Sequence, residues 1–135
     1  MSVEEFKGWL LSNVSNFKLI GTKALAKAGV KVTPSDRDVL VRMSDIPLGC
    51  LGCIIELAVK EEEEAKYKWT YAVIKLGRID FIICDDVVYD AKAMAHDSVL
   101  AYAMSCETAR IRLEDKQFRY GFASAVIFSK LREVF

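Results

Sequence analysis

Between Cys53 and Phe122 the apolar residues change their spacing twice, and this change constrains the fold more than any other feature. Alternation with a period of two is typical of strands, whereas recurrence at three and four residues is typical of helices. The region therefore predicts three strands, one helix and a closing two-stranded hairpin. The expected elements are strands at Cys53–Val59, Trp69–Leu76 and Ile79–Cys84, a helix at about Asp90–Glu107, and a hairpin within Ala109–Phe122.

The expected hairpin has one apolar side and one basic side. Ile111, Leu113 and Phe118 share the apolar side, and Glu114–Gln117 is a four-residue turn between the two strands. A helix over Ser124–Phe135 closes the chain, with inward-facing positions at Val126, Ile127, Leu131 and Val134. Glu61–Glu64 is expected to be a solvated hairpin tip between the first two strands.

The first third of the chain predicts helices. Val3–Ile20 has apolar residues at helical spacing, and Ser2 with Glu5 has the spacing of a capping box. A short second helix over Thr22–Ala28 stops at Gly29, and Thr33–Asp36 has the residues of a helix start. The segment that follows, Asp38–Ser44, suits a helix and a strand equally well.

Together these elements predict a single α+β domain over residues 1–135. Residues 1–48 are its helical N-terminal part, and residues 49–135 form a sheet with helices. The element order β-β-β-α-β-β-α after the N-terminal helices predicts a mostly antiparallel five-stranded sheet packed by helices. With 135 residues, the chain is long enough to bury a core without a disulfide framework.

Composition limits the classes of function. The chain has no apolar run near the ~20 residues that span a bilayer, and its acidic start lacks the basic region of a signal peptide. A cytosolic location without a membrane partner is the default expectation. Two Asn, one Gln and one His against 38 charged side chains favour a thermophilic origin. The formal net charge of zero argues against a field over the whole protein that attracts nucleic acid.

His96 is the only histidine, so metal sites that need two histidines are excluded. It lies early in the helix expected after the third strand, near Asp85, Asp86 and Asp90 at the strand end. An imidazole in that position can act as a general base or a phosphoryl acceptor. The alternative is a partly exposed histidine on a helix face.

Part of the chain resembles two families that act on phosphorus-containing substrates. Its order is similar to that of the Janus-type protein-histidine phosphatases: Tyr71–Leu76, His96, Arg110-Ile111, Asp115-Lys116 and Tyr120-Gly121. Glu107-Thr108-Ala109 replaces the glycine triplet that this family has before Arg-Ile. His96-Asp97-Ser98 followed by Arg110–Leu113 also resembles viral ring nucleases that cleave cyclic oligoadenylate, without their N-terminal strand motif and glycine-rich closing segment. Each resemblance covers about half of the chain and implies His96-dependent phosphohistidine or phosphoester chemistry.

Cys50-Leu51-Gly52-Cys53 is a C-x-x-C motif on a loop that enters an expected strand. A redox motif of the thioredoxin type opens a helix instead, so that interpretation is set aside. A structural zinc site needs Cys84 and Cys106 to complete four thiolates. Free thiols, a disulfide and a metal site remain open, and free thiols with no metal and no cofactor are the expectation.

Arg110, Arg112, Lys116 and Arg119 lie on the basic side of the expected hairpin. A ribbon of this kind can bind phosphate or enter a major groove, and the alternative is an ordinary solvated face. Glu64-Ala65-Lys66 has the form of a nuclease E-x-K motif, but it lies in a charge run rather than on an apolar strand.

No complete catalytic constellation emerges, and an enzyme is not favoured. The leading hypothesis is a small domain that self-associates or binds a protein partner, because the first helix has more apolar surface than one face needs if Trp9 and Leu11 stay exposed. The first alternative is a His96-dependent phosphoester or phosphohistidine enzyme in which Arg110, Arg112 or Lys116 binds phosphate. The second is nucleic-acid binding through the ribbon of Arg110, Arg112 and Arg119.

Overall fold

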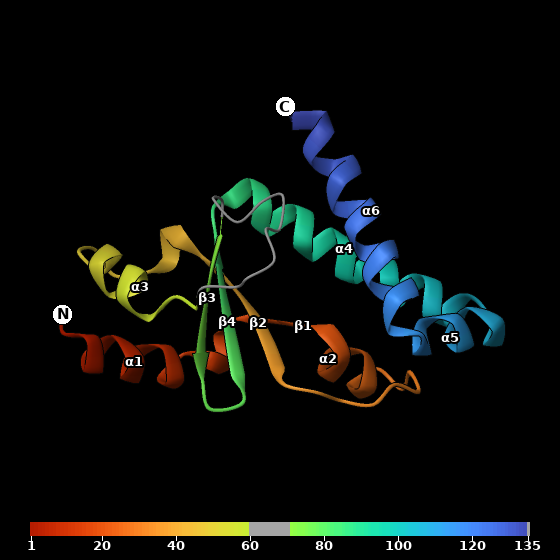
Figure 1. Ribbon diagram of the computed structural model, residues 1–135, viewed down its shortest axis with the longest axis horizontal. Helices are drawn as coiled ribbons and strands as arrows, with labels where there is room; N and C mark the ends of the chain where they lie inside the picture. The colour runs from red at the N-terminus through yellow and green to blue at the C-terminus, as the bar shows by residue number, and fades with distance from the viewer. Residues whose placement is uncertain (60–70, 135) are drawn as a thin grey trace.

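The computed structural model describes residues 1–59 and 71–134 and has an α+β architecture (Figure 1). Within these residues the helices are α1 (Val3–Ser12), α2 (Gly21–Lys27), α3 (Leu51–Leu57), α4 (Asp86–Ser105), α5 (Glu107–Glu114) and α6 (Lys116–Val134). The strands are β1 (Lys18–Ile20), β2 (Arg37–Arg42), β3 (Tyr71–Leu76) and β4 (Ile79–Cys84), and short 3₁₀ turns span Val14–Asn16 and Met43–Asp45.

The described strands form one mixed sheet in the order β1-β2-β4-β3. β1 pairs with β2 and β3 pairs with β4 in antiparallel fashion, whereas β2 and β4 are parallel. The α+β class is confirmed, but the prediction of five mostly antiparallel strands is wrong. The turn at Gly77-Arg78 between β3 and β4 is as expected, and φ is +63° at Gly77.

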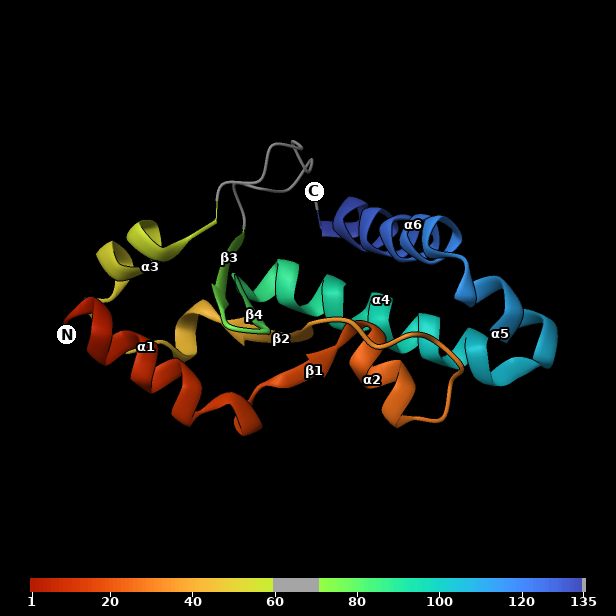
Figure 2. The same ribbon diagram turned by 60° about the horizontal axis from the view of Figure 1, so that its bottom comes forward.

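The two faces of the sheet bury different parts of the chain. Because side chains alternate along a strand, Val39 and Val41 face one side and Leu40 the other. Val39 and Val41 pack with Phe6 and Leu10 of α1 in the larger core, which also takes Cys53 and Ile54 of α3, and Ile74, Phe81 and Ile83 of the sheet. Leu40 packs instead against α4 and α6, with Val88, Ala91 and Leu131. Figure 2 shows α6 lying along α4 on this side.

The segment Cys53–Val59, expected to be a strand, is mostly the helix α3. Its buried side chains, Cys53 and Ile54, follow Cys50 at three and four residues, and Leu57 continues that spacing. Helical periodicity is therefore present, but the flanking exposed Leu51 and Ile55 make the run look uniformly apolar. A short run of this kind is ambiguous between a buried strand and a helix until its packing is known.

The prediction of a closing hairpin is also wrong, because residues 107–134 form α5 and α6. Ala109 and Leu113 are buried one turn apart, and Phe118 and Phe122 contact each other one turn apart. Both pairs fit a helix, although the same residues alternate in sequence. The Cys106 thiol accepts a hydrogen bond from the Ala109 amide and so begins α5. The closing helix is confirmed in type, with Leu131 buried and Val134 exposed.

In the N-terminal part α1 begins at the expected capping box, with both reciprocal hydrogen bonds between Ser2 and Glu5. α1 ends at Ser12, well before Ile20, because Lys18–Ile20 leave as β1. α2 matches the short second helix to within a residue at each end. The helix start expected at Thr33–Asp36 is wrong, since those residues form the connection that leads into β2. Glu61–Glu64 and Glu64-Ala65-Lys66 lie outside the described residues.

Candidate functional site: a cleft between α6 and the end of β2

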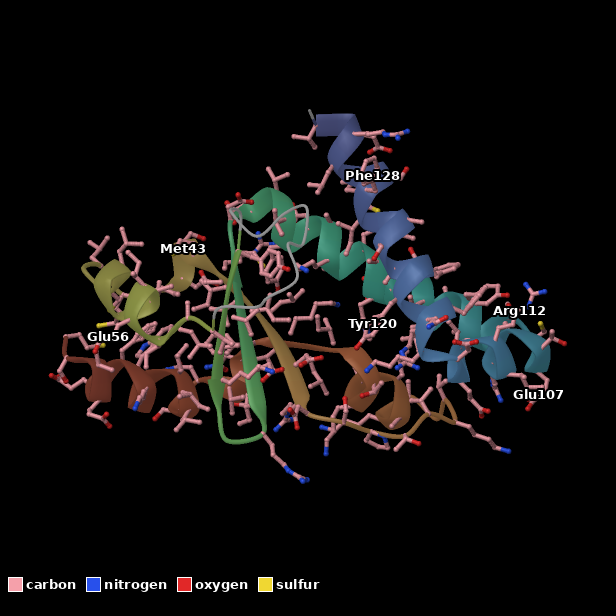
Figure 3. The ribbon with its side chains drawn as sticks, in the orientation of Figure 1. Met43, Glu56, Glu107, Arg112, Tyr120 and Phe128 are labelled. Atoms are coloured by element: carbon pink, nitrogen blue, oxygen red, sulfur yellow. The ribbon has the colours of Figure 1, made fainter. Side chains whose placement is uncertain are left out.

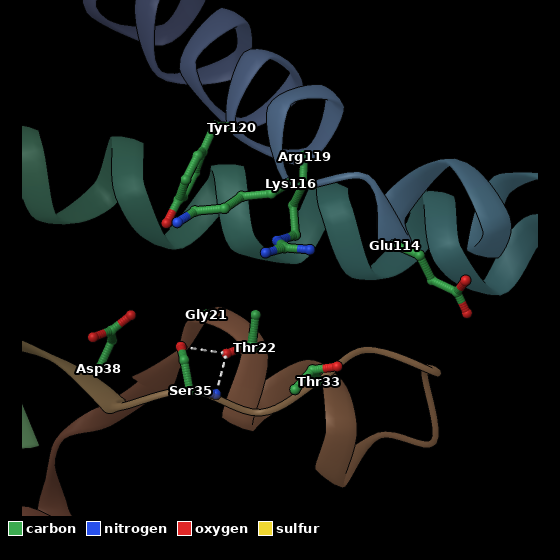
Figure 4. A pocket seen from close by; sticks show the side chains of 9 residues that line it. All are labelled: Gly21, Thr22, Thr33, Ser35, Asp38, Glu114, Lys116, Arg119 and Tyr120. Carbon is green, nitrogen blue, oxygen red and sulfur yellow. Dashed lines mark hydrogen bonds between the residues drawn. The ribbon is translucent and has the colours of Figure 1, made fainter. Parts of the chain in front are cut away.

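A cleft lies between the start of α6 and the layer that holds α2 and β2 (Figure 4). It consists of two hollows of about 310 and 270 Å³, which share Gly21, Asp38, Arg119 and Tyr120. We call the first the polar compartment, which is also lined by Thr22, Ser35 and Lys116. The second is the apolar compartment, which extends to Leu25, His96, Val99, Ala123 and Ile127. Such volumes are at the small end of ligand-binding sites.

The first turn of α6 provides the basic wall. The Asp115 carboxylate accepts hydrogen bonds from the amides of Gln117 (2.8 Å) and Phe118 (3.3 Å), which fixes the start of the helix. Residues three and four apart share a helix face, so Lys116, Arg119 and Tyr120 point into the cleft together (Figure 4).

The Arg119 guanidinium is also anchored by a hydrogen bond to the backbone. Its Nη1 donates a 2.8 Å hydrogen bond to the Leu113 carbonyl at the end of α5. The Lys116 ammonium lies 5.5 Å and the Arg119 guanidinium 5.8 Å from the centre of the Tyr120 ring. These contacts leave donors of both cations available to a ligand in the cleft.

Hydroxyl groups line the opposite wall. The Ser35 amide donates to Thr22 Oγ1 at 3.0 Å, and the two hydroxyl oxygens of Thr22 and Ser35 are 2.9 Å apart. Only one hydroxyl proton is used between the two oxygens, so the other proton is available for a ligand. Thr22 is 8% exposed, whereas Ser35 is exposed at the surface of the connection before β2.

Asp38 occupies the junction of the two compartments. In the parallel pairing of β2 with β4 it is aligned with Asp80. Burial, together with the neighbouring negative charge of Asp80, raises the pKa of Asp38 to about 6. Asp80 Oδ2 is 3.5 Å from Lys75 Nζ, whereas its buried Oδ1 has no hydrogen-bond partner among the described residues.

The absence of a side chain at Gly21 leaves room for the Asp38 carboxyl. Its φ of +74° is rarely adopted by residues with a side chain, and a Cβ at this position would lie 2.7 Å from Asp38 Oδ2. The end of β1 and the start of α2 therefore approach the Asp38 carboxyl closely only because residue 21 is glycine.

His96 lines the apolar compartment from α4. Burial lowers its pKa from the ordinary 6.5, against the opposing effect of Asp97. Asp97 itself pairs with Lys18 at 3.2 Å. The imidazole is therefore mostly neutral near pH 7, with one nitrogen able to donate and the other able to accept a hydrogen bond.

The structure thus brings together three of the residues singled out in the sequence, His96, Lys116 and Arg119. Arg110 and Arg112 lie elsewhere, on α5, and the expected ribbon is absent because this region is helical. Arg110 donates to the Ala103 carbonyl at 3.1 Å and lies 3.7 Å from Glu107. Figure 3 shows Arg112 and Glu107 at the outer end of the molecule, away from Tyr120.

The acidic residues expected near His96 have structural roles instead. Asp85 caps α4 by accepting from the Val88 amide at 2.9 Å. Asp86 and Asp90 bind the Arg42 guanidinium at 2.9 and 3.1 Å. The site residues expected from the sequence do not include Asp38, Thr22, Ser35 or Tyr120, which all line the cleft. A carboxylate next to the apolar run Val39-Leu40-Val41 was the one available signal for Asp38.

The four cysteines do not gather into one site. Cys50 is the residue immediately before α3 and is buried with Cys53 beside Met1, so the C-x-x-C motif opens a helix rather than entering a strand. Cys84 lies at the end of β4, where burial raises its pKa to about 12, and Cys106 is at the start of α5. All four are free thiols, and no cluster of three metal-binding side chains occurs in the described residues.

Comparison of the chain with protein-family models, with curated proteins and with solved structures finds no match. Among the residues that the structure describes, none of the helices combines the length and the apolar character that crossing a bilayer requires. The cleft itself is therefore the basis for a functional proposal.

Proposed function

We propose that this protein binds a small phosphate-bearing organic anion in the cleft, with Lys116 and Arg119 as the phosphate ligands. The observation that carries the proposal is that these two cations extend from one turn of α6 into the cleft, where the Arg119 guanidinium faces the Thr22–Ser35 hydroxyl pair and the Lys116 ammonium lies beside the end of the Tyr120 side chain (Figure 4). A guanidinium and an ammonium that converge with hydroxyl donors suit the oxygens of a phosphate group.

The charges around the cleft support an anion rather than a cation. Neither Lys116 nor Arg119 forms an ion pair with a described residue, and the Glu114 carboxylate points away from the two cations (Figure 4). Asp38 is the one carboxylate on the wall opposite them, at the junction of the two compartments. An anion that binds at Lys116 and Arg119 gains two charge-assisted contacts.

The test is calorimetric titration with inorganic phosphate and pyrophosphate, comparing the wild type with Lys116→Ala and Arg119→Ala. Each removed contact to a charged group is expected to weaken binding about tenfold or more. Arg112→Ala is the matched control, because it removes a cation of the same region outside the cleft. Equal loss in the control, or phosphate binding unchanged by both cleft variants, contradicts the proposal. Thermal melting of each variant verifies that it is folded.

A second candidate function is self-association through the exposed face of α3. Leu51 and Ile55, one turn apart on α3, are 62% and 71% exposed, and Leu48 in the turn before the helix is 101% exposed. Exposed apolar residues on neighbouring turns favour a second copy of the chain as the partner. Trp9, suspected from the sequence, packs instead between Phe6 and Phe17 at ring-centre distances of 6.1 and 6.0 Å.

Light scattering tests this candidate. A dimer that becomes monomeric in Ile55→Glu, but not in the control Ile111→Glu on α5, supports it. A monomeric wild type at high protein concentration contradicts it. Ile111 is a suitable control because it is itself 59% exposed and lies on a different helix.

The remaining sequence hypotheses have different support. Nucleic-acid binding through a basic ribbon loses its structural basis, because the ribbon is replaced by α5 and α6. Phosphoester or phosphohistidine chemistry at His96 stays a prediction, and His96 lies in the apolar compartment rather than beside Lys116. The cytosolic location and the thermophilic origin also stay predictions.

A further inference from the structure

We propose that the ligand of the cleft is a nucleoside monophosphate, with its phosphate in the polar compartment, its ribose at Asp38 and its base in the apolar compartment. This inference rests on the proposed function and adds the class of ligand. The evidence is that the two compartments differ in polarity and that Asp38 and Tyr120 border both of them.

The two compartments provide opposite chemistry within one continuous cleft. The polar compartment contains the two cations and the hydroxyl pair. The apolar compartment is bounded mostly by Leu25 of α2, Val99 of α4, and Ala123 and Ile127 of α6. Lys92 of α4 also lines it, with its ammonium 4.3 Å from the centre of the Tyr71 ring. A ligand that fills both must have an anionic end and a largely apolar body. Inorganic phosphate fills only the first.

A flat base fits the second compartment better than an aliphatic body. Tyr120 borders both compartments and is 59% exposed, so a base can stack on the part of its ring that Lys116 and Arg119 leave uncovered. Every base has a π-face that can make such a contact with an aromatic side chain. His96, half-buried at the same compartment, offers one donor and one acceptor to the edge of a base.

Asp38 lies where a ribose would connect the base to the phosphate. A carboxylate is an acceptor that recognises sugar hydroxyls in nucleotide-binding proteins. Gly21 keeps this carboxyl close to the chain at the junction, because any larger residue there would contact Asp38 Oδ2. The order of cations, carboxyl and apolar wall along the cleft is thus the order of phosphate, sugar and base.

The charge balance favours one phosphate over two or three. The polar compartment has Lys116 and Arg119 on one side, but it is also bordered by Glu114. A longer polyphosphate would have to extend past the two cations towards Glu114 and Lys31, which line the adjoining hollow. A carboxylate accompanies the additional cation there, so each further phosphate gains little net attraction.

The experiment compares four ligands by calorimetry: inorganic phosphate, ribose 5-phosphate, the nucleoside 5′-monophosphates and the corresponding diphosphates. The expected result is at least tenfold tighter binding of one monophosphate than of ribose 5-phosphate, with no gain for its diphosphate. Equal binding of ribose 5-phosphate and every monophosphate overturns the inference and leaves the phosphate site standing. Absence of binding by all four, phosphate included, overturns the proposed function as well.

Substitution of two serines on α6 tests where the base of the ligand binds. Ser124 lines the apolar compartment, whereas Ser129 lies on another side of the helix, and both are exposed. Ser124→Trp is expected to abolish the advantage of the monophosphate while phosphate binding stays within twofold of wild type. Ser129→Trp is expected to leave both unchanged. A Ser124→Trp protein that still prefers the monophosphate contradicts the placement of the base.

A short single-stranded oligonucleotide with a 5′-phosphate distinguishes a free nucleotide from the end of a nucleic acid. Equal or weaker binding of the oligonucleotide supports the free nucleotide. Binding of the oligonucleotide that is tighter by an order of magnitude overturns the assignment to a free mononucleotide.

Discussion

The two faces of the sheet differ in how completely they are covered. The face under α1 and α3 has Val39, Val41 and Phe81 all at 1% exposure or less. On the face under α4 and α6, β2 has Leu40 between two charged residues, Asp38 and Arg42, although Ile82 and Cys84 of β4 extend the apolar surface there. One strand therefore contributes a closed core on one side and a partly open, charged surface on the other.

The two charged positions on that second face have opposite surroundings. Arg42 is paired with Asp86 and Asp90, and its guanidinium lies 3.9 Å from the centre of the Tyr89 ring. Asp38, two residues before Leu40, lies beside another carboxylate, and its pKa is raised to about 6. A charge with favourable partners stabilises the fold, whereas a carboxyl held next to a like charge costs stability, and we propose that Asp38 is retained there for ligand binding.

The largest expected effect concerns the closed face. Phe6→Ala removes a fully buried ring from the core between α1 and the sheet, and it should cost about 3–5 kcal/mol of unfolding free energy. Urea denaturation measures this cost, and Leu11→Ala on the exposed side of α1 is the control, with less than about 1 kcal/mol expected. Phosphate affinity should be unchanged under conditions where the variant is folded. A parallel loss of affinity would mean that the two faces are not independent.

An intermediate effect is expected at Gly21. Gly21→Ala should cost about 2 kcal/mol, because it combines a positive φ with the close approach to Asp38. Gly29→Ala is matched in backbone conformation, with a φ of +91°, but nothing lies near its Cβ position. The difference between the two variants, measured by denaturant unfolding, isolates the contact with Asp38. That difference should disappear when both are made in an Asp38→Ala background; if it persists, the contact is not its origin.

The smallest expected effect is the pH dependence at Asp38. Because its pKa in the folded protein is about 6 rather than the ordinary 3.8, the folded state binds more protons than the unfolded state between these values. Asp38 therefore favours folding most below pH 3.8, and this contribution is lost as the pH rises through 6. Solvent screening reduces the effect to about 1 kcal/mol, or about 4 °C in melting temperature.

Asp38→Asn keeps the shape without the charge, so it should melt higher than the wild type at pH 7.5 and close to it at pH 4. Thermal melts in phosphate-free buffer provide the comparison. A variant that melts lower at pH 7.5 would show that the Asp38 carboxylate stabilises the sheet, and the contrast with Arg42 would then fail.

Local signals in the sequence identified some elements well. The capping box at Ser2 and Glu5, the alternation of Ile79–Cys84 and the turn at Gly77-Arg78 all depend on residues close together in the chain. Short apolar runs were misassigned at Cys53–Val59 and Ala109–Phe122, because two periodicities fit the same residues there. Only the layer against which each run packs selects between them.

The candidate site was also predictable only in part from residues that are close together in the chain. His96, Lys116 and Arg119 drew notice as rare or clustered residue types, but the sequence placed Lys116 and Arg119 on a strand ribbon with Arg110 and Arg112. The helical start at Asp115 instead turns Lys116 and Arg119 towards α2. Asp38 went unnoticed, because its properties come from Asp80, which is 42 residues away in sequence and adjacent only through the parallel pairing.

The sequence by itself determined the α+β class, the positions of caps and tight turns, and the content of charged and apolar residues. These properties depend on residues that are neighbours in the chain. Such residues stay close together whatever the tertiary arrangement. The tertiary structure alone decided that β2 lies parallel to β4, that residues 107–134 are helical, and that a cation pair faces a carboxyl across a cleft. Those outcomes depend on which apolar surfaces, from segments far apart in the sequence, pack against each other and exclude water. A pattern within a few neighbouring residues does not specify that packing.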